Sequence, residues 1–197
     1  MDTRDNILKK ISDGRGFIRT SGLTQTERRA LYSAVETSDV IKLKNGLYIL
    51  PEYLTNVQFN IERIIPGSIL CMWSAWDYYG LTDSYPPAVC VAVENHRQVN
   101  IAREPYFKIY FRSGPALTLG VTELEENGSK FLIYNREKCV CDAVRYRNKI
   151  GEDVTTDILR TYIRHSRIRP DFNKLFEYAQ QLGVEKYLKI ILNYEMC

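Results

Sequence analysis

Hydrophobic residues near the start of the chain recur twice at the spacing of a helix. In the first segment Ile7 and Ile11 fall on one face, which predicts a helix that buries this face. The second segment begins with Thr24 and Glu27, three residues apart, which is the spacing of a capping box. We therefore expect a second helix over about 25–36, with its apolar stripe packed inward.

Two short β-prone runs, 40–43 and 47–50, follow the second predicted helix, and a third run precedes it. The dipeptide Asn45-Gly46 between the two later runs is the one most typical of a tight hairpin turn. The order helix, strand, helix and hairpin is that of a winged helix-turn-helix, although residues 20–23 are too few for a full middle helix. A winged domain is predicted over 1–54.

The remainder of the chain is predicted to be a connecting helix or linker at 55–67 and a mixed domain over 68–197. Ser68 is expected to cap an apolar helix, and Pro170 to start a later one. The predicted strands are 88–93, 107–111, 121–125 and 130–134, and helices are predicted near 135–147, 152–165, 170–182 and 184–195. The predicted class is therefore α+β, with a helical C-terminal segment.

The outward face of the second predicted helix carries side chains suited to DNA. Glutamine pairs with adenine and arginine with guanine in the major groove, while tyrosine and hydroxyl side chains bind phosphate or sugar. Lysines on the hairpin and hydroxyls at the helix start are placed for phosphates. The predicted DNA contacts are Arg19, Thr20, Ser21, Thr24, Gln25, Thr26, Arg28, Arg29, Tyr32, Lys42 and Lys44.

Charge supports this interpretation only locally. The net charge of the whole chain is +3, which permits a nucleic-acid partner without indicating one. Residues 15–48 contain six Lys or Arg against three acids, a surplus equal to that of the whole chain. A solvated helix face is the alternative; the order of the elements and the basic hairpin favour double-stranded DNA.

Other features exclude several classes of protein. No apolar run has the length of a membrane helix, and the polar first residues argue against a signal peptide. The five cysteines are odd in number and lack Cys-x-x-Cys spacing, which predicts reduced thiols in a cytoplasmic protein. With two histidines in the chain, few ligands are available, and neither a metal nor a cofactor is predicted.

Three further groups have both a structural and a functional interpretation. A basic stretch is either a solvated helix end or a second surface for nucleic acid or for countering a toxin; it comprises Arg160, Arg164, Arg167 and Arg169. Core packing is favoured over base stacking for Trp73, Trp76, Tyr78 and Tyr79. Burial is favoured over redox or metal chemistry for Cys139 and Cys141.

A metal-dependent nuclease would need converging carboxylates, and the strand candidates supply Glu94, Glu123 and Glu125. No Asp…Glu-x-Lys pattern links them, and phosphate-loop and hydrolase motifs are absent from the sequence. Catalysis is therefore not predicted. A protein-interaction module with a vestigial winged half is the other alternative.

Several short motifs follow one another along the chain. In the predicted winged domain they are Phe17-Ile18, Leu31-Tyr32 with Glu36, and 44–51. Further motifs lie at 66–71, 74–75, 78–82, 89–93, 114–121, 133–138 and 142–151. In order and spacing they resemble the AbiEi-type antitoxins over about residues 5–192. The short segment 20–23 departs from the longer helix of that family.

The resemblance implies a transcriptional repressor that acts as the antitoxin of a type IV toxin–antitoxin, or abortive-infection, system used in phage defence. It implies binding to an operator upstream of the protein's own gene, with repeated or palindromic half-sites. The implied functional partner is a nucleotidyltransferase-like toxin that the antitoxin opposes without forming a stable complex.

Overall fold

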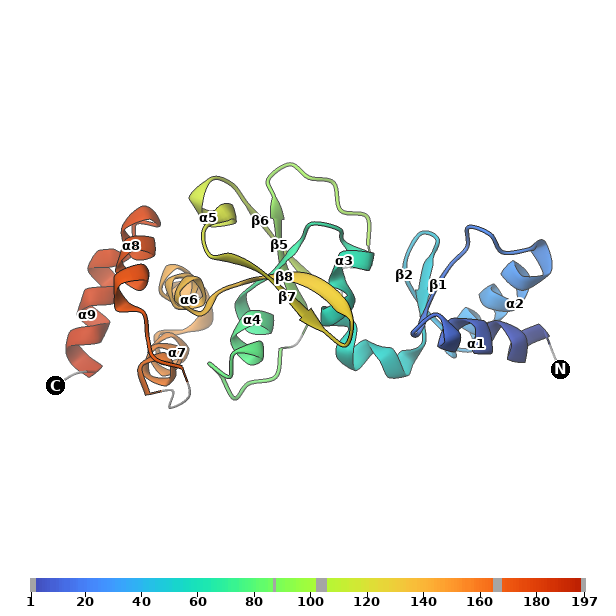
Figure 1. Ribbon diagram of the computed structural model, residues 1–197, viewed down its shortest axis with the longest axis horizontal. Helices are drawn as coiled ribbons and strands as arrows, with labels where there is room; N and C mark the ends of the chain where they lie inside the picture. The colour runs from blue at the N-terminus through green and yellow to red at the C-terminus, as the bar shows by residue number, and fades with distance from the viewer. Residues whose placement is uncertain (1–2, 87, 102–105, 165–167, 196–197) are drawn as a thin grey trace.

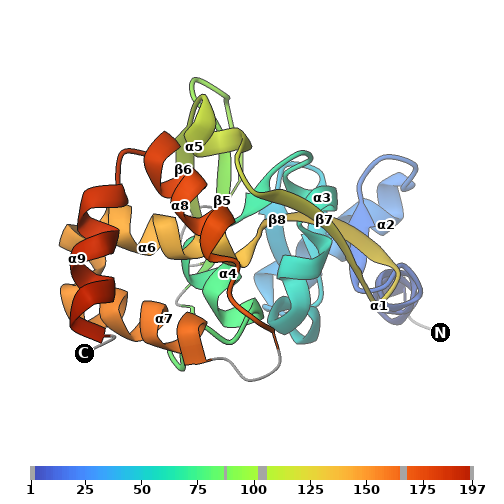
Figure 2. The same cartoon turned by 60° about the vertical axis from the view of Figure 1, so that its left-hand side comes forward.

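The computed structural model describes residues 3–86, 88–101, 106–164 and 168–195. The molecule is elongated, with a small sheet and two helices at one end, a larger sheet in the middle and a group of helices at the other end (Figure 1). The same order along the long axis is visible after rotation (Figure 2). The predicted α+β class, with an N-terminal winged arrangement, is confirmed.

The N-terminal part has the predicted order of helix, strand, helix and hairpin. Its strands pair antiparallel in the order β1-β3-β2, so that the last strand lies in the middle. The elements are α1 (Thr3–Asp13), β1 (Phe17–Arg19), α2 (Gln25–Glu36), β2 (Ile41–Lys44) and β3 (Leu47–Ile49). The hairpin turn at Asn45-Gly46 is confirmed.

Residues 20–24 form a turn between β1 and α2, as their shortness predicted. Leu23 from this turn is buried in the core between the helices and the small sheet. The backbone N–H of Thr20 donates to the carbonyl of Gly46 at 3.0 Å, which ties the turn to the tip of the hairpin. The turn is thus a fixed part of the N-terminal elements α1 to β3, which are called here the winged unit.

The small sheet is buried on both faces. Ile18 and Tyr48 face α1 and α2 and share a core with Leu31. Phe17 and Leu47 face the other way and belong to the main hydrophobic core of the molecule. Side chains alternate between the two faces of a strand, so three short strands can contribute buried side chains to both cores.

The connecting segment lies under this second face. Where a connecting helix or linker is predicted at 55–67, the chain forms a 3₁₀ segment, η1 (Pro51–Asn60), followed by one α-helical turn, α3 (Ile61–Ile64). Asn56 has non-helical backbone angles and interrupts the segment. Ile61 and Ile64 are fully buried against the small sheet and the larger one. One side of the connection is therefore packed into the core, and its other side is exposed.

Within the described residues, five strands form the larger mixed sheet, in the order β6-β5-β4-β8-β7. Pairs β5/β6 and β4/β8 are parallel, and β4/β5 and β7/β8 antiparallel. The strands are β4 (Ile69–Leu70), β5 (Val89–Glu94), β6 (Phe107–Arg112), β7 (Val121–Glu126) and β8 (Ser129–Tyr134), and the turn α5 (Pro115–Thr118) follows β6. The four predicted strands are confirmed.

The prediction that Ser68 caps a helix is wrong. Ile69 and Leu70 are extended and lie between β5 and β8, and the helix α4 (Met72–Tyr78) starts only after Cys71. The Ser68 hydroxyl is buried and has no hydrogen-bond partner among the described residues. A central strand buried on both faces is continuously apolar, so periodicity alone does not distinguish it from a buried helix.

The C-terminal helices follow the prediction closely. They are α6 (Arg136–Ile150), α7 (Glu152–Arg164), α8 (Phe172–Gln181) and α9 (Glu185–Glu195). One correction concerns Pro170, which precedes α8: Asp171 is the N-cap, and its carboxylate accepts from the N–H of Lys174 at 3.0 Å. None of the helices in the described residues combines the length and apolar content that crossing a bilayer requires.

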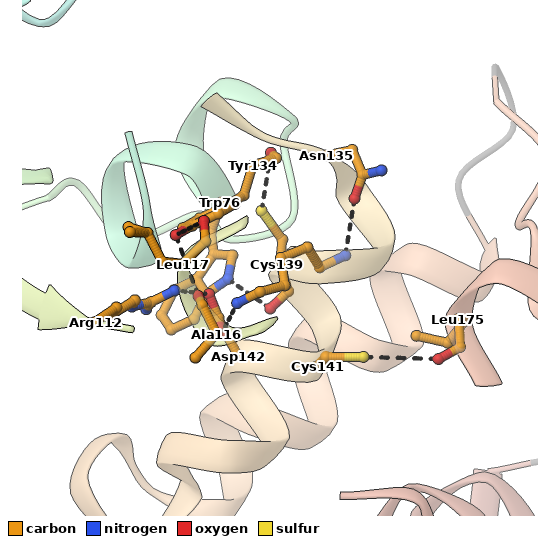
Figure 3. Close-up of polar contacts among 11 residues, drawn as sticks. Trp76, Arg112, Ala116, Leu117, Tyr134, Asn135, Cys139, Cys141, Asp142 and Leu175 are labelled. Carbon is orange, nitrogen blue, oxygen red and sulfur yellow. Dashed lines mark hydrogen bonds and ion pairs between the residues drawn. The ribbon is translucent and has the colours of Figure 1, made fainter. Parts of the chain in front are cut away.

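The aromatic and cysteine groups pack as predicted. Trp76 is completely buried, and its indole N–H donates to the carbonyl of Cys139 at 3.0 Å (Figure 3). The ring of Trp73 meets that of Trp76 edge to face at 5.1 Å. Cys139 and Cys141 are buried free thiols, and burial raises the pKa of Cys141 to about 12. Such thiols are protonated at neutral pH, which matches a packing role.

Candidate nucleic-acid interface

The start of α2 is fixed by the predicted capping box. The N–H of Glu27 donates to the Thr24 hydroxyl at 3.3 Å, and the Thr24 N–H donates to the Glu27 carboxylate at 2.8 Å. Lys10 of α1 donates to the same carboxylate at 2.9 Å. These contacts, led by that of Lys10, lower the pKa of Glu27 to about 2. Glu27 therefore holds α2 against α1 as a carboxylate.

The outward face of α2 is open to solvent. Leu31 and Ala34 are completely buried, while the predicted contacts Gln25, Thr26, Arg28 and Arg29 are exposed. Tyr32 is 48% exposed, and its ring centroid lies 6.3 Å from that of Tyr48 on β3. In the part of the chain that the structure describes, neither arginine has a side-chain hydrogen bond or an ion pair. Both guanidinium groups are therefore available to a ligand.

Lys42 lies on the same side of the sheet as α2. It pairs with Tyr48 in the register of β2 and β3, and residues paired across two strands share a face. Tyr48 faces the core beneath α2 and contacts Tyr32, so Lys42 projects beside the helix from the edge strand. Lys42 is exposed, and its ammonium has no partner among the described residues.

Lys44 lies on the opposite side of the sheet. The register shifts between Lys42 and Lys44, which then pairs with Leu47 on the face of the main core. Such a bulge re-aims a side chain that strict alternation would place with Lys42. The Lys44 ammonium donates to the carbonyl of Ile64 on α3, and burial lowers its pKa, with help from Arg19 and Arg97.

Arg19, also predicted to contact DNA, takes part in the same arrangement. Its guanidinium donates to the carbonyl of Arg63 at 3.1 Å, and that of Arg97 donates to the carbonyl of Pro66 at 2.6 Å. The last carbonyls of a helix lack partners within the helix and favour nearby cations. Arg19 and Lys44 therefore join the winged unit to the end of α3, a role that sequence reasoning missed.

The remaining predicted contacts surround the helix start: Ser21 and Thr24 are exposed, and Thr20 is half-buried beside Gly46 at the hairpin tip. The exposed surface formed by Gln25, Arg28, Arg29, Tyr32 and Lys42 is called here the α2–wing face. The helix α2, which carries four of these residues, lies at the end of the molecule away from the larger sheet (Figure 1).

The predicted second basic surface is less coherent. Arg160 donates to Asp157 at 3.0 Å, one turn away on α7, while Arg164 and Arg169 are exposed. Arg167 lies outside the described residues. The helix α7, which carries Arg160 and Arg164, lies at the end of the molecule opposite α2 (Figure 1). It is therefore not part of the α2–wing face.

The structure separates the carboxylates considered for a nuclease. Glu94 is on β5, whereas Glu123 and Glu125 are on β7, three strand positions away in the sheet. At about 4.8 Å per strand this separation is about 14 Å. Within the described ranges, no group of three or more His, Cys, Asp or Glu side chains is arranged to hold a metal ion.

A buried charge cluster was missed by sequence reasoning. The two oxygens of Asp142 on α6 accept from the Arg112 guanidinium at 2.6 Å and from the Lys138 ammonium at 2.5 Å, and none of the three side chains is more than 2% exposed. Figure 3 shows Arg112 reaching Asp142 from the sheet. The only sequence signals were the Lys138–Asp142 spacing of four and the alternation of Lys108, Tyr110 and Arg112 on β6.

No protein-family model matches this chain, and no curated protein matches it. The resemblance to the AbiEi-type antitoxins therefore stays a hypothesis that rests on the sequence motifs.

Proposed function

We propose that this protein is a sequence-specific DNA-binding transcriptional repressor that uses the α2–wing face. The observation that carries the proposal is the pair Arg28 and Arg29, two exposed guanidinium groups without partners among the described residues, on a helix held rigidly from behind. Lys42, on the hairpin, lies on the side of the small sheet that faces α2 and is likewise unpaired among the described residues. Three unpaired cations on one helix and the strand edge beside it fit a polyanion.

Each part of the face has a distinct task in this proposal. The N-terminal half of α2 enters the major groove, where Gln25, Arg28 and Arg29 read base edges. Tyr32 and Lys42 border the groove and bind backbone phosphates, which orient the helix without reading sequence. The turn at 20–24 presents Ser21 to the neighbouring phosphate, while the Thr24 hydroxyl stays in the capping box with Glu27. Lys44 and Arg19 have another task, because both bind carbonyls at the end of α3.

The antitoxin role is proposed from the resemblance alone. In it, the protein represses its own operon and opposes a nucleotidyltransferase-like toxin without a stable complex. The simplest test of this role is to identify the neighbouring gene, which should encode such a toxin. Expression of that toxin should arrest growth, and co-expression of this chain should restore it. Failure to restore growth would remove the antitoxin role and leave DNA binding to be judged separately.

DNA binding is tested by gel shift with the DNA upstream of the protein's own gene. Replacing Arg28 or Arg29 by Gln should cost about 1–3 kcal/mol of binding free energy if that residue contacts a base. Replacing Lys42 by Gln should weaken binding to all sequences and reduce the salt slope by about 0.9.

The matched control for these variants is Lys9→Gln. Lys9 is an exposed lysine of α1 outside the α2–wing face, so its replacement removes the same charge from the same unit. We expect wild-type affinity for this variant. A triple variant of Arg28, Arg29 and Lys42 that binds operator DNA as tightly as the wild type would refute the proposed face.

A further inference from the structure

A second charged region lies between β6 and α6, far from the α2–wing face. Alternation along β6 places Lys108, Tyr110 and Arg112 on one face of the edge strand. Helical spacing places Asp142 and Tyr146 on the facing side of α6, and the rings of Tyr110 and Tyr146 meet edge to face at 6.0 Å. This face of the sheet and this helix therefore bury polar groups together.

The charges of the buried cluster do not balance. Arg112 and Lys138 are both cations, and Asp142 is the one carboxylate that binds them among the described residues. Lys108 and Lys149 add positive charge nearby, since their ammonium groups lie 5.6 Å and 5.7 Å from the ring centroids of Tyr110 and Tyr146. A buried excess of positive charge is costly unless an anion compensates it.

Arg112 also has hydrogen-bond donors for which the described residues supply no acceptor. The residue is 4% exposed, and one of its terminal nitrogens binds Asp142. Its Nε and Nη2 atoms are buried and have no partner among the described residues. Tyrosine rings surround the guanidinium, with centroids 5.1 to 5.9 Å from its central carbon. These rings offset some of the positive charge, but a ring cannot replace the in-plane acceptors that the two nitrogens lack.

A cavity of about 180 Å³ lies where these groups meet. Arg112 and Asp142 line it, together with Arg145 and the polar side chains of Asn95 and Ser113. Since one water occupies about 30 Å³ of liquid volume, the cavity has room for a tetrahedral anion. Arg145 is exposed at the surface, so it can reach a ligand without being part of the buried core.

We infer that this cavity is a binding site for a phosphate group, held between the unpaired edge of Arg112 and the guanidinium of Arg145. Phosphate accepts several charge-assisted hydrogen bonds and matches the planar fork of arginine. Asn95 and Ser113 supply further donors, and Asp142 is already occupied by its two cations. The site is distinct from the α2–wing face and does not depend on DNA binding.

The phosphate has two possible sources, free inorganic phosphate and the phosphate group of a nucleotide. The half-buried Tyr146 also lines the cavity and offers aromatic surface on which a base can stack. Both sources use the same contacts to Arg112 and Arg145, so a comparison of probes distinguishes them.

The test is calorimetric titration of the full chain with inorganic phosphate, adenosine 5′-monophosphate and adenosine. Phosphate and the monophosphate should bind saturably at one site, and adenosine should not. Tighter binding of the monophosphate would identify a nucleotide, and equal binding would identify phosphate itself. Absence of saturable binding of either up to about 10 mM, or equal binding of adenosine, would overturn the site.

Arg112 contributes to the core, so the variant of choice is Arg145→Gln. It should raise the Kd for phosphate about tenfold. The control is Lys186→Gln, an exposed lysine of α9 outside the cavity, which should bind as the wild type does. The Nε–H resonance of Arg112 in a ¹⁵N spectrum should also shift on addition of phosphate. A wild-type Kd in Arg145→Gln, or an unmoved Arg112 resonance, would refute the assignment.

Discussion

Replacement of Asp142 by Asn tests whether the buried cluster is held together by this one carboxylate. Its oxygens lie 2.6 Å from the Arg112 nitrogen and 2.5 Å from the Lys138 nitrogen, and the side chains are 0–2% exposed. At an effective dielectric constant of about 20, each contact supplies about 6 kcal/mol of attraction, most of which desolvation offsets. Breaking a buried pair costs about 3–5 kcal/mol net, and since Asp142 joins two cations we expect the upper end.

The assay is urea unfolding followed by tryptophan fluorescence in phosphate-free buffer. Trp76 reports on this region, because its indole donates to the carbonyl of Cys139, three residues before Asp142 on α6. The matched variant is Lys138→Met, which removes one cation and leaves Arg112 and Asp142 as a neutral pair. It should cost less than Asp142→Asn, because it leaves no buried charge without a partner. The reasoning fails if Asp142→Asn costs no more than Lys138→Met.

Three further predictions concern the winged unit. The pKa of Glu27 is lowered from 4.5 to about 2, so its stabilising contribution is complete above pH 4.5 and disappears as the pH falls toward 2. The difference in unfolding free energy between wild type and Glu27→Gln should therefore shrink from pH 6 to pH 3, and a constant difference would contradict this assignment. Lys44→Met should lower the melting temperature but leave operator affinity within about twofold. Lys42→Gln should weaken operator binding but leave the melting temperature nearly unchanged, since exposed substitutions change stability by about 0.5 kcal/mol or less. A Lys44→Met variant with normal stability and weak DNA binding would show that Lys44 contacts DNA after all. Leu47→Ala, at a position 2% exposed between the small sheet and the connecting segment, should cost about 2–5 kcal/mol by urea unfolding, and a cost below 1 kcal/mol would show that this face is not a rigid part of the core.

Much of the fold could be predicted because its signals are local. The capping box at Thr24 and Glu27, the Asn45-Gly46 turn and the helical periodicity after 135 each involve residues a few positions apart. Their geometry depends on backbone hydrogen bonds and caps within the same segment, so it follows from the sequence. The exposed face of α2 followed from the same periodicity.

Other features of the fold depended on which strands, distant in the sequence, pair with one another. Ile69 and Leu70 became a strand because β5 and β8 supply partners on both sides, which no local pattern encodes. The bulge in β2 turned Lys44 toward α3 and left Lys42 beside α2, a choice made by register with β3.

The sequence alone thus determined most of the helices and strands and the basic helix face of this protein, but not the strand at 69–70 or the 3₁₀ segment η1. Only the tertiary structure decided which cations stay available and which are buried. Arg112 and Asp142 are thirty positions apart on different elements, and their pairing depends on the packing of α6 across β6. Periodicity specifies which face of an element is buried, whereas the partner of a buried charge depends on contacts that are distant in the chain.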